Sequence, residues 1–249
     1  MSTTSETIHI SGTTDDPSVV ARAALRDRGV QMCSELAAKV ELATELRLSG
    51  ADRELARRRL VSFCNQRVSR FLAVTDQVLY AVAAGAAESR LLVRALRIQR
   101  RLVAAEIDNL NRAEGNAEIV IAAAHALLTL LRGCLEIEQF VLLPALATLP
   151  GVNLAALVED IDTLLEGGEL AKIEVLDVRE IPHGQRHPRI FGLYARLAGG
   201  ESFVLVNNHD PKPLRREFEA TYPDEFGWHY EKSGPTEWRV RIERRAGRS

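Results

Sequence analysis

Cysteine is scarce in this 249-residue chain, which contains only Cys33, Cys64 and Cys134. The count is odd and the spacing matches no metal-binding pattern, so neither a disulfide framework nor a zinc site is indicated. Free thiols in a reducing compartment are the simplest interpretation, and we therefore expect a cytoplasmic protein. Each cysteine is expected to act as a small buried hydrophobic side chain, because no activating base or cation can be placed beside it.

An excess of charge of either sign is also absent. The chain has 32 basic and 34 acidic residues, and its formal net charge is −2 at pH 7. This balance gives no general attraction to nucleic acid or to acidic lipid, so we expect neither as a partner. The local basic clusters are predicted to be solvent-exposed faces with acidic neighbours; they are Arg57 to Arg59, Arg97, Arg100 and Arg101, and the C-terminal Arg239, Arg241, Arg244, Arg245 and Arg248.

Long apolar runs and recognisable catalytic motifs are missing as well. The longest apolar stretch, residues 119–131, is interrupted by His125 and closed by Arg132, and it predicts a buried helix rather than a membrane span. Residues 1–16 are polar, lack the pattern of a secretory signal and are expected to be disordered. Hydrolase motifs, phosphate loops, dinucleotide fingerprints and internal repeats are not found.

The first two-thirds of the chain has helical periodicity. Asp16-Pro17 is typical of a helix start, Ser49 to Asp52 breaks the pattern with Asp52 as the expected cap, and Gly85 and Gly115-Asn116 mark further breaks. The predicted long helices span residues 17–48, 52–84, 88–112 and 117–146, and a short one spans 154–165. Long helices with short connections predict an antiparallel four-helix bundle over residues 17–166, followed by a linker over 167–173.

The composition changes after the linker. Residues 175–178, 203–207, 228–230 and 238–242 have the character of strands, and Pro188 to Leu197 and Pro211 to Thr221 are predicted helices begun by proline. The order β-α-β-α-β-β predicts helices on one side of a small mixed sheet, a two-layer sandwich over residues 174–243 with a basic tail over 244–249. The fold class is therefore α+β with two domains.

Two helical segments resemble signatures of hemerythrin-like, HHE-type cation-binding domains. Cys134 to Gln139, followed by Leu142-Leu143-Pro144-Ala145-Leu146, is similar to the last helix of that family, in which a histidine precedes a glutamate by four residues. Glu138 matches the glutamate, but Cys134 stands at the histidine position. Phe71 to Asp76 resembles the second helix, with Phe71 in place of the histidine and Thr75 in place of the glutamate.

The other two helices depart from the same family in a similar way. Gln99 falls at a histidine position of the third helix, and Arg28-Gly29 falls where the first helix tends to have one. A di-iron centre needs several imidazoles and carboxylates that converge from facing helices. We therefore expect no metal or other cofactor in this bundle. His125 is out of phase with Cys134 and is expected to face away from the centre.

Glu138 then needs an explanation, since a buried carboxylate without a counter-charge is costly. It could be solvated, protonated, hydrogen-bonded to Gln99 or Thr75, or paired with an arginine. A sharper hypothesis is a polar ligand pocket; its candidate residues are Phe71, Thr75, Gln99, Cys134 and Glu138.

The C-terminal segment resembles the domain of unknown function 2249. The motifs are Leu176 to Pro182, His187-Pro188-Arg189-Ile190-Phe191, His209 to Leu214, Trp228-His229-Tyr230, Gly234-Pro235 and Trp238-Arg239-Val240. That family often accompanies hemerythrin-like domains and is distantly similar to TusA-like sulfur carriers. The carriers present a cysteine after the first strand, whereas this chain has Pro182-His183-Gly184-Gln185, so the resemblance does not extend to persulfide carriage.

A histidine group remains in this segment, made of His183, His187 and His209 with Asp210. Three imidazoles and a carboxylate could bind zinc, iron or heme. The alternative is that these residues only cap helices and form turns. A helix start beside Lys212, Arg215 and Arg216 also suits an anion, although a solvated helix face is the plainer interpretation.

Two function classes follow. The first is a bacterial hemerythrin-like protein that has lost its di-iron ligands and acts in ligand binding, regulation or interaction, with a small molecule, another protein or a second copy of itself as partner. The second is an iron- or heme-dependent oxidoreductase or redox or gas sensor, using a remodelled bundle pocket or the C-terminal histidines.

Overall fold

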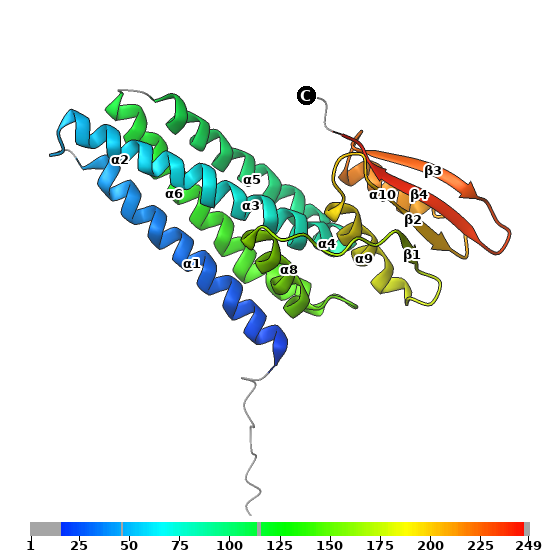
Figure 1. The fold of residues 1–249 in the computed structure, drawn as a ribbon. Coiled ribbons are helices and arrows are strands. Elements are labelled where there is room, and N and C mark those ends of the chain that lie inside the picture. The colour runs from blue at the N-terminus through cyan, green and yellow to red at the C-terminus, as the bar shows by residue number, and fades with distance from the viewer. Residues whose placement is uncertain (1–15, 46, 114–115, 247–249) are drawn as a thin grey trace, which may run out of the picture.

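A computed structural model describes residues 16–45, 47–113 and 116–246. Most of the predicted N-terminal tail (1–15), Gly115 of the predicted turn and the last residues of the basic tail (247–249) lie outside the described residues. The chain forms a helical N-terminal region and a small C-terminal region with a mixed sheet (Figure 1).

The helical region begins with α1 (Pro17–Thr44). The next helix is continuous but contains two π-helical segments, and it comprises α2 (Gly50–Phe63), η2 (Cys64–Val68), α3 (Ser69–Thr75), η3 (Asp76–Tyr80) and α4 (Ala81–Ala84). The third long helix is α5 (Ala87–Arg112). The fourth is again continuous and comprises α6 (Ala117–Ile137), the π-helical η4 (Glu138–Leu142) and α7 (Leu143–Thr148), and the short α8 (Leu154–Glu166) follows it. Helix α6 packs along both α1 and α5.

The helix ends follow local chemistry. The Asp16 carboxylate accepts a hydrogen bond from the Ser18 backbone N–H at 2.8 Å, as the sequence predicts for this start. At α2 the predicted cap is wrong: Ser49, not Asp52, is the N-cap, and its Oγ accepts from the Asp52 N–H. Helix α1 also ends at Thr44, earlier than predicted, because the chain turns to an extended conformation at Glu45.

The α6–α7 helix, Ala117–Thr148, is long and apolar enough to cross a membrane by length and composition. Only 33% of its most apolar window is buried. The helix is much longer than the apolar stretch from which a buried helix was predicted, because it continues through η4 and α7. Core helices of soluble proteins pass the same test, so this composition alone assigns no membrane role.

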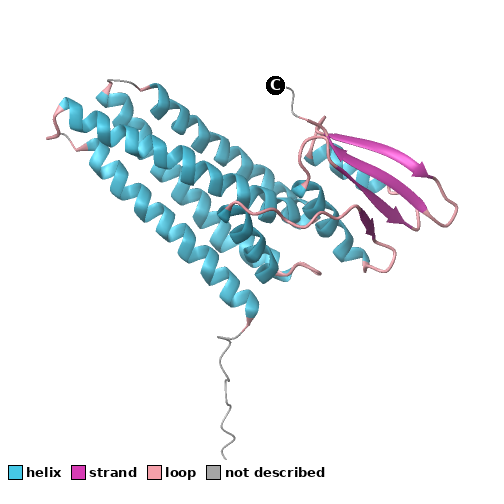
Figure 2. Ribbon diagram, viewed as in Figure 1, coloured by secondary structure: helices cyan, strands magenta, loops and turns pink. Residues whose placement is uncertain are grey.

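The C-terminal region has the predicted element order. It consists of β1 (Val175–Asp177), α9 (His183–Arg196), β2 (Ser202–Asn207), α10 (Lys212–Thr221), β3 (Phe226–Lys232) and β4 (Trp238–Arg244). The strand order is β1-β2-β4-β3, with β1 parallel to β2 and the other pairs antiparallel (Figure 2). Helix α9 begins at His183, not at Pro188 as predicted, and Pro188 lies inside the helix, where its missing N–H removes one intrahelical hydrogen bond.

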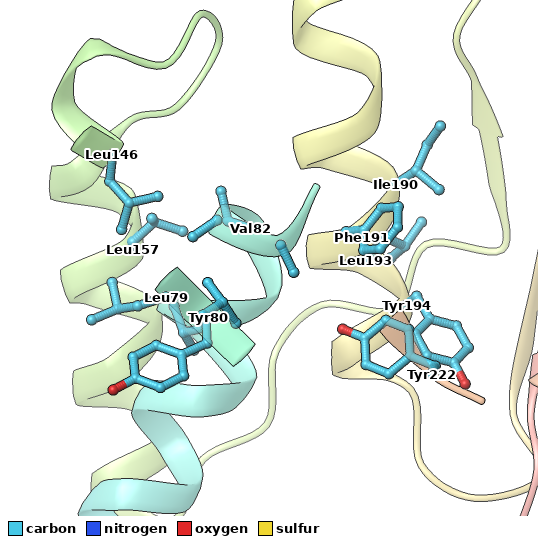
Figure 3. Packing of buried hydrophobic residues seen from close by; sticks show 14 of the residues in the cluster. Leu79, Tyr80, Val82, Leu146, Leu157, Ile190, Phe191, Leu193, Tyr194 and Tyr222 are labelled. Atoms are coloured by element: carbon cyan, nitrogen blue, oxygen red, sulfur yellow. The ribbon is translucent and has the colours of Figure 1, made fainter. Parts of the chain in front are cut away.

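The two regions share one hydrophobic core. Figure 3 shows Val82 of α4 opposite Phe191 of α9, and the same buried cluster extends to Tyr80 and Leu146 on one side and to Tyr222 on the other. A Cβ atom added to Gly85 would lie 2.8 Å from the His187 carbonyl oxygen, so glycine allows the two backbones this close approach. The C-terminal region is thus packed against the end of the helical region.

Two arginines predicted on exposed faces are buried. Arg57 is 7% exposed, pairs with Glu54 and donates to the Leu110 carbonyl oxygen at 3.0 Å. Arg100 is also 7% exposed and lies on the core side of α5. The prediction for both was wrong, because it considered acidic neighbours along the helix but not the phase of each arginine within the buried stripe.

Candidate functional site

A polar cluster lies inside the helical region, where apolar side chains would be expected. We call it the polar centre, and its members come from different helical segments. They are Thr75 at the end of α3, Tyr80 in η3, Arg100 in α5, Cys134 in α6 and Glu138 in η4. Each of these side chains is buried.

Two members of the polar centre lie in π-helical segments. In η3 the Ala81 N–H bonds to the Asp76 carbonyl, and in η4 the Leu143 N–H bonds to the Glu138 carbonyl, each one residue longer than an α-helical bond. Pro144 follows directly and has no N–H, so it cannot make an ordinary α-helical bond at this point. Such segments are rare in proteins and occur often at functional sites.

One carboxylate oxygen collects the hydrogen bonds of the centre. Glu138 Oε1 accepts from Tyr80 Oη at 2.5 Å, from Arg100 Nη2 at 2.8 Å and from Cys134 Sγ at 3.4 Å. Among the described residues none donates a hydrogen bond to the second oxygen, Oε2. The carboxylate is therefore paired through one oxygen only.

Arg100 makes the other connections of the centre. Its Nη2 also donates to Thr75 Oγ1 at 2.7 Å, and its Nη1 donates to the Leu72 carbonyl oxygen at 2.5 Å. The guanidinium carbon lies 3.8 Å from the centre of the Tyr80 ring, in cation–π geometry. Arg100 thus binds one carboxylate, one hydroxyl, one carbonyl and one aromatic face.

Burial and charge shift the pKa values of the centre in a consistent way. Burial raises the pKa of Tyr80, and the nearby Glu138 carboxylate raises it further, so the phenol stays protonated and remains a donor. Burial, with the same carboxylate, raises the pKa of Cys134 to about 11. Burial opposes the charged form of Arg100, but Glu138 outweighs it and the pKa of Arg100 is raised. The electrostatics therefore favour a neutral thiol and phenol around an ion pair.

The resemblance to hemerythrin-like domains would place a di-iron centre here, and the residues do not fit one. A guanidinium is bonded to the only candidate carboxylate in the centre, and no imidazole is among the members. Across the described residues, no three His, Cys, Asp or Glu side chains are close enough to hold a metal ion. His125 is exposed, on the side of α6 away from the centre.

The predicted pocket residues are brought together only in part. Thr75, Cys134 and Glu138 are connected in the polar centre through hydrogen bonds to Arg100 Nη2 and to Glu138 Oε1. Gln99 does not join them: its Nε2 donates to the Leu130 carbonyl oxygen at 3.3 Å, between α5 and α6. Phe71 is buried next to the centre and forms part of a cavity wall.

That cavity has a volume of about 540 Å³ and lies between α1 and the α3 and α6–η4 segments. Its inner wall includes Thr75 and Glu138, and its outer part includes the exposed Val30 and Phe140. Most of the wall area is apolar, and the remaining polar members of the wall are Arg26, Cys33, Ser34, Arg132, Glu136 and Gln139. A molecule in this cavity could therefore contact apolar side chains and the polar centre together.

Sequence reasoning missed Tyr80 and Arg100, although a signal for Arg100 was present. The buried residues of α5 include Val93, Leu96, Val103 and Ile107, and Arg100 falls within this helical stripe at intervals of three and four residues. A charged residue inside such a stripe indicates a buried partner, and Glu138 is that partner.

The C-terminal histidines do not form a metal site. The rings of His183 and His209 lie 6.1 Å apart, while His187 Nδ1 is 2.9 Å from Glu217, which also pairs with Arg90. Asp210 accepts from Tyr230 Oη at 2.8 Å and pairs with Lys212. Three of the four predicted residues (His183, His187 and His209) line one small cavity, and Asp210 is engaged elsewhere.

Comparison with protein families assigns the C-terminal region only. Residues 175–244 match the family described as "Uncharacterized conserved protein (DUF2249)", which confirms the resemblance drawn from the sequence motifs. Neither the curated proteins nor the solved structures gave a match. The helical region therefore has to be interpreted from its own geometry.

Proposed function

We propose that the chain is a hemerythrin-like four-helix protein in which an arginine–glutamate pair replaces the di-iron centre, and that it binds a small molecule as a regulatory or interaction protein. The observation that carries the proposal is the bond between Arg100 and Glu138, the glutamate that matches the family signature. The guanidinium supplies the positive charge that a metal would otherwise supply to this carboxylate.

The ligand class follows from the cavity between α1 and α6. Most of its wall is apolar, and the one polar acceptor left without a donor at its inner end is Glu138 Oε2, within the described residues. The fitting molecule is largely apolar and carries one hydrogen-bond donor, such as a hydroxyl group. For the alternative function, redox chemistry at a protein-bound iron centre, the described residues contain no group of three or more His, Cys, Asp or Glu side chains that could hold the metal ion.

Two measurements test the proposal. Elemental analysis of protein purified without added metal should give no stoichiometric iron, and a dinuclear iron content would contradict it. Fluorescence titration should then show binding of 2-naphthol, which has a hydroxyl donor, and weaker binding of naphthalene, which has none. Equal affinity for the two probes would remove Glu138 from the proposed site.

A matched pair of variants locates the probe. Ala37 lines the cavity, whereas its neighbour Ala38 is exposed and does not. Ala37→Phe should fill the cavity and weaken 2-naphthol binding by about tenfold or more, and Ala38→Phe should leave it unchanged. Equal effects of the two substitutions would place the probe elsewhere.

A further inference from the structure

Arg186 is a buried charge without an acidic partner. Its side chain lies in the first turns of α9, and the residue is 8% exposed. Nε donates to the Ile181 carbonyl oxygen at 2.6 Å and Nη2 donates to the Arg179 carbonyl oxygen at 3.2 Å, but the buried Nη1 has no partner. A buried guanidinium that meets only carbonyl groups is costly, so the site favours a negative charge from outside the chain.

Arg186 lines a small cavity of about 40 Å³. The other polar residues of its wall are His183, His187, Asn207 and His209, and none of them carries a negative charge. The volume exceeds the space that one water molecule needs and suits a group of a few heavy atoms. His183 reaches the cavity from the start of α9 and His209 from the loop after β2, and both are exposed, so the cavity has an outer side formed by imidazoles.

The start of α9 adds further donors. The helix begins at His183, and the residue before it, Pro182, provides no side-chain cap. The first N–H groups of a helix lack intrahelical partners, and the helix dipole favours an anion there. Here the Gln185 N–H already bonds to the Pro182 carbonyl oxygen at 2.9 Å, which leaves the N–H groups of His183 and Gly184 for an outside acceptor. Two acids beside lining residues are engaged in pairs of their own: Glu217 with His187 and Arg90, and Asp210 with Tyr230 and Lys212.

We propose that Arg186, His183 and His209 form, with the first turn of α9, a binding site for a small oxoanion of phosphate or sulfate type. The motifs that define this segment, His187-Pro188 and His209-Asp210-Pro211, converge on the same cavity. The site is separate from the cavity between α1 and α6 and does not depend on the function proposed for it. Because α9 also packs on α4, an anion here would lie beside the contact between the two regions.

The test is a titration of the ¹⁵N-labelled full-length chain with sodium phosphate, and separately with sodium sulfate, at constant ionic strength maintained with sodium chloride. Saturable amide shifts should concentrate at His183 to Arg186. Arg186→Met should weaken binding by about tenfold or more. Arg189→Met removes an exposed arginine of the same helix and should leave the affinity unchanged.

A second pair of substitutions keeps the test decisive if Arg186→Met fails to fold by circular dichroism. His183→Gln and His209→Gln change only exposed rings, and their combination should weaken oxoanion binding several-fold. No saturable shift with either salt would overturn the proposal. Equal losses in Arg186→Met and Arg189→Met, or no loss in the combined histidine variant, would also overturn it, since only a diffuse surface effect would remain.

Discussion

The two regions of this protein use charged side chains in opposite ways. In the helical region Arg100 and Glu138 form an ion pair with both side chains less than a tenth exposed. In the C-terminal region the pairs on the strands lie at the surface, as with Arg241 and Glu231 on the outer face of the sheet. Arg186 is the exception there, since it is buried and has no acidic partner among the described residues.

The difference shows where each region can support chemistry. Burial of a pair costs the desolvation of both charges, which their mutual attraction and multiple hydrogen bonds offset, so removal of one member leaves a charge that nothing compensates. A surface pair is screened by water and contributes little. The helical region therefore has a fixed polar centre next to a cavity, whereas the C-terminal region has its unusual groups at a helix start and in loops.

The largest effect is expected from breaking the buried pair. Arg100→Met should lower the free energy of unfolding by about 3–5 kcal/mol, because Glu138 is left buried without a counter-charge. Arg101→Met, at the exposed neighbouring position, should change it by less than about 0.5 kcal/mol. Urea denaturation measures both.

The double variant Arg100→Met with Glu138→Met sharpens the same comparison. It removes both charges, so much of the lost stability should return. Equal stabilities of Arg100→Met and Arg101→Met would contradict the assignment of Arg100 to the polar centre.

A smaller effect is expected at the contact between the regions. Gly85→Ala should cost about 1–3 kcal/mol, because the new Cβ would lie 2.8 Å from the His187 carbonyl oxygen and backbone atoms would have to move. Gly50→Ala meets open space and serves as the control, with an effect near zero or slightly stabilising. Thermal unfolding of both variants checks this, and equal melting temperatures would mean that the regions pack loosely.

Alkaline pH should weaken the helical region, which holds all three cysteines. Burial raises the pKa of Cys64 from 9.0 to about 12, so between these values the unfolded chain loses the thiol proton while the folded chain keeps it. The unfolded state then binds fewer protons, and the free energy of unfolding falls as pH rises. Cys64 should account for about 1 kcal/mol of that fall between pH 9 and pH 10. Cys64→Val should show a shallower decline by this amount in urea denaturation, and an identical slope would contradict the burial of this thiol.

The smallest effect is expected on the outer face of the sheet. Arg241→Gln removes the partner of Glu231, but both side chains are at least three-tenths exposed. The expected loss is about 0–1 kcal/mol and should shrink further in high salt. A loss as large as that of Arg100→Met would remove the contrast between the two regions.

Much of the fold could be predicted because it depends on local patterns. Asp16 and Pro17 predict the start of α1, and Gly85 predicts the end of the second long helix. In the C-terminal region the order of strands and helices follows from the alternation of apolar and polar residues and from the positions of the prolines. The errors of this kind changed the bounds of elements but not their existence; they are the end of α1, the cap at Ser49 and the start of α9. The family motifs of the C-terminal region were also sufficient to identify it.

The candidate site could be predicted only in part. Helical spacing places Cys134 and Glu138 on one face, because residues four apart share a face of a helix, whereas Thr75 was placed beside them by the resemblance to the hemerythrin-like signatures. The choice between Gln99 and Arg100 was different, since neighbouring residues point about 100° apart and the packing of α5 against its neighbours selects one of them. The apolar stripe of α5 indicates that position 100 faces inward, but no local pattern identifies Glu138 as the partner that Arg100 meets there.

The sequence by itself determined the helices, the strands and their order, since these depend on residues close together in the chain. Only the tertiary structure decided that Arg100 meets Glu138 and Tyr80, that a cavity opens beside them, and that α9 packs on α4. Those contacts join residues far apart in the chain. They form because the burial of apolar area fixes how the elements pack, and this packing cannot be predicted from any short segment of the sequence.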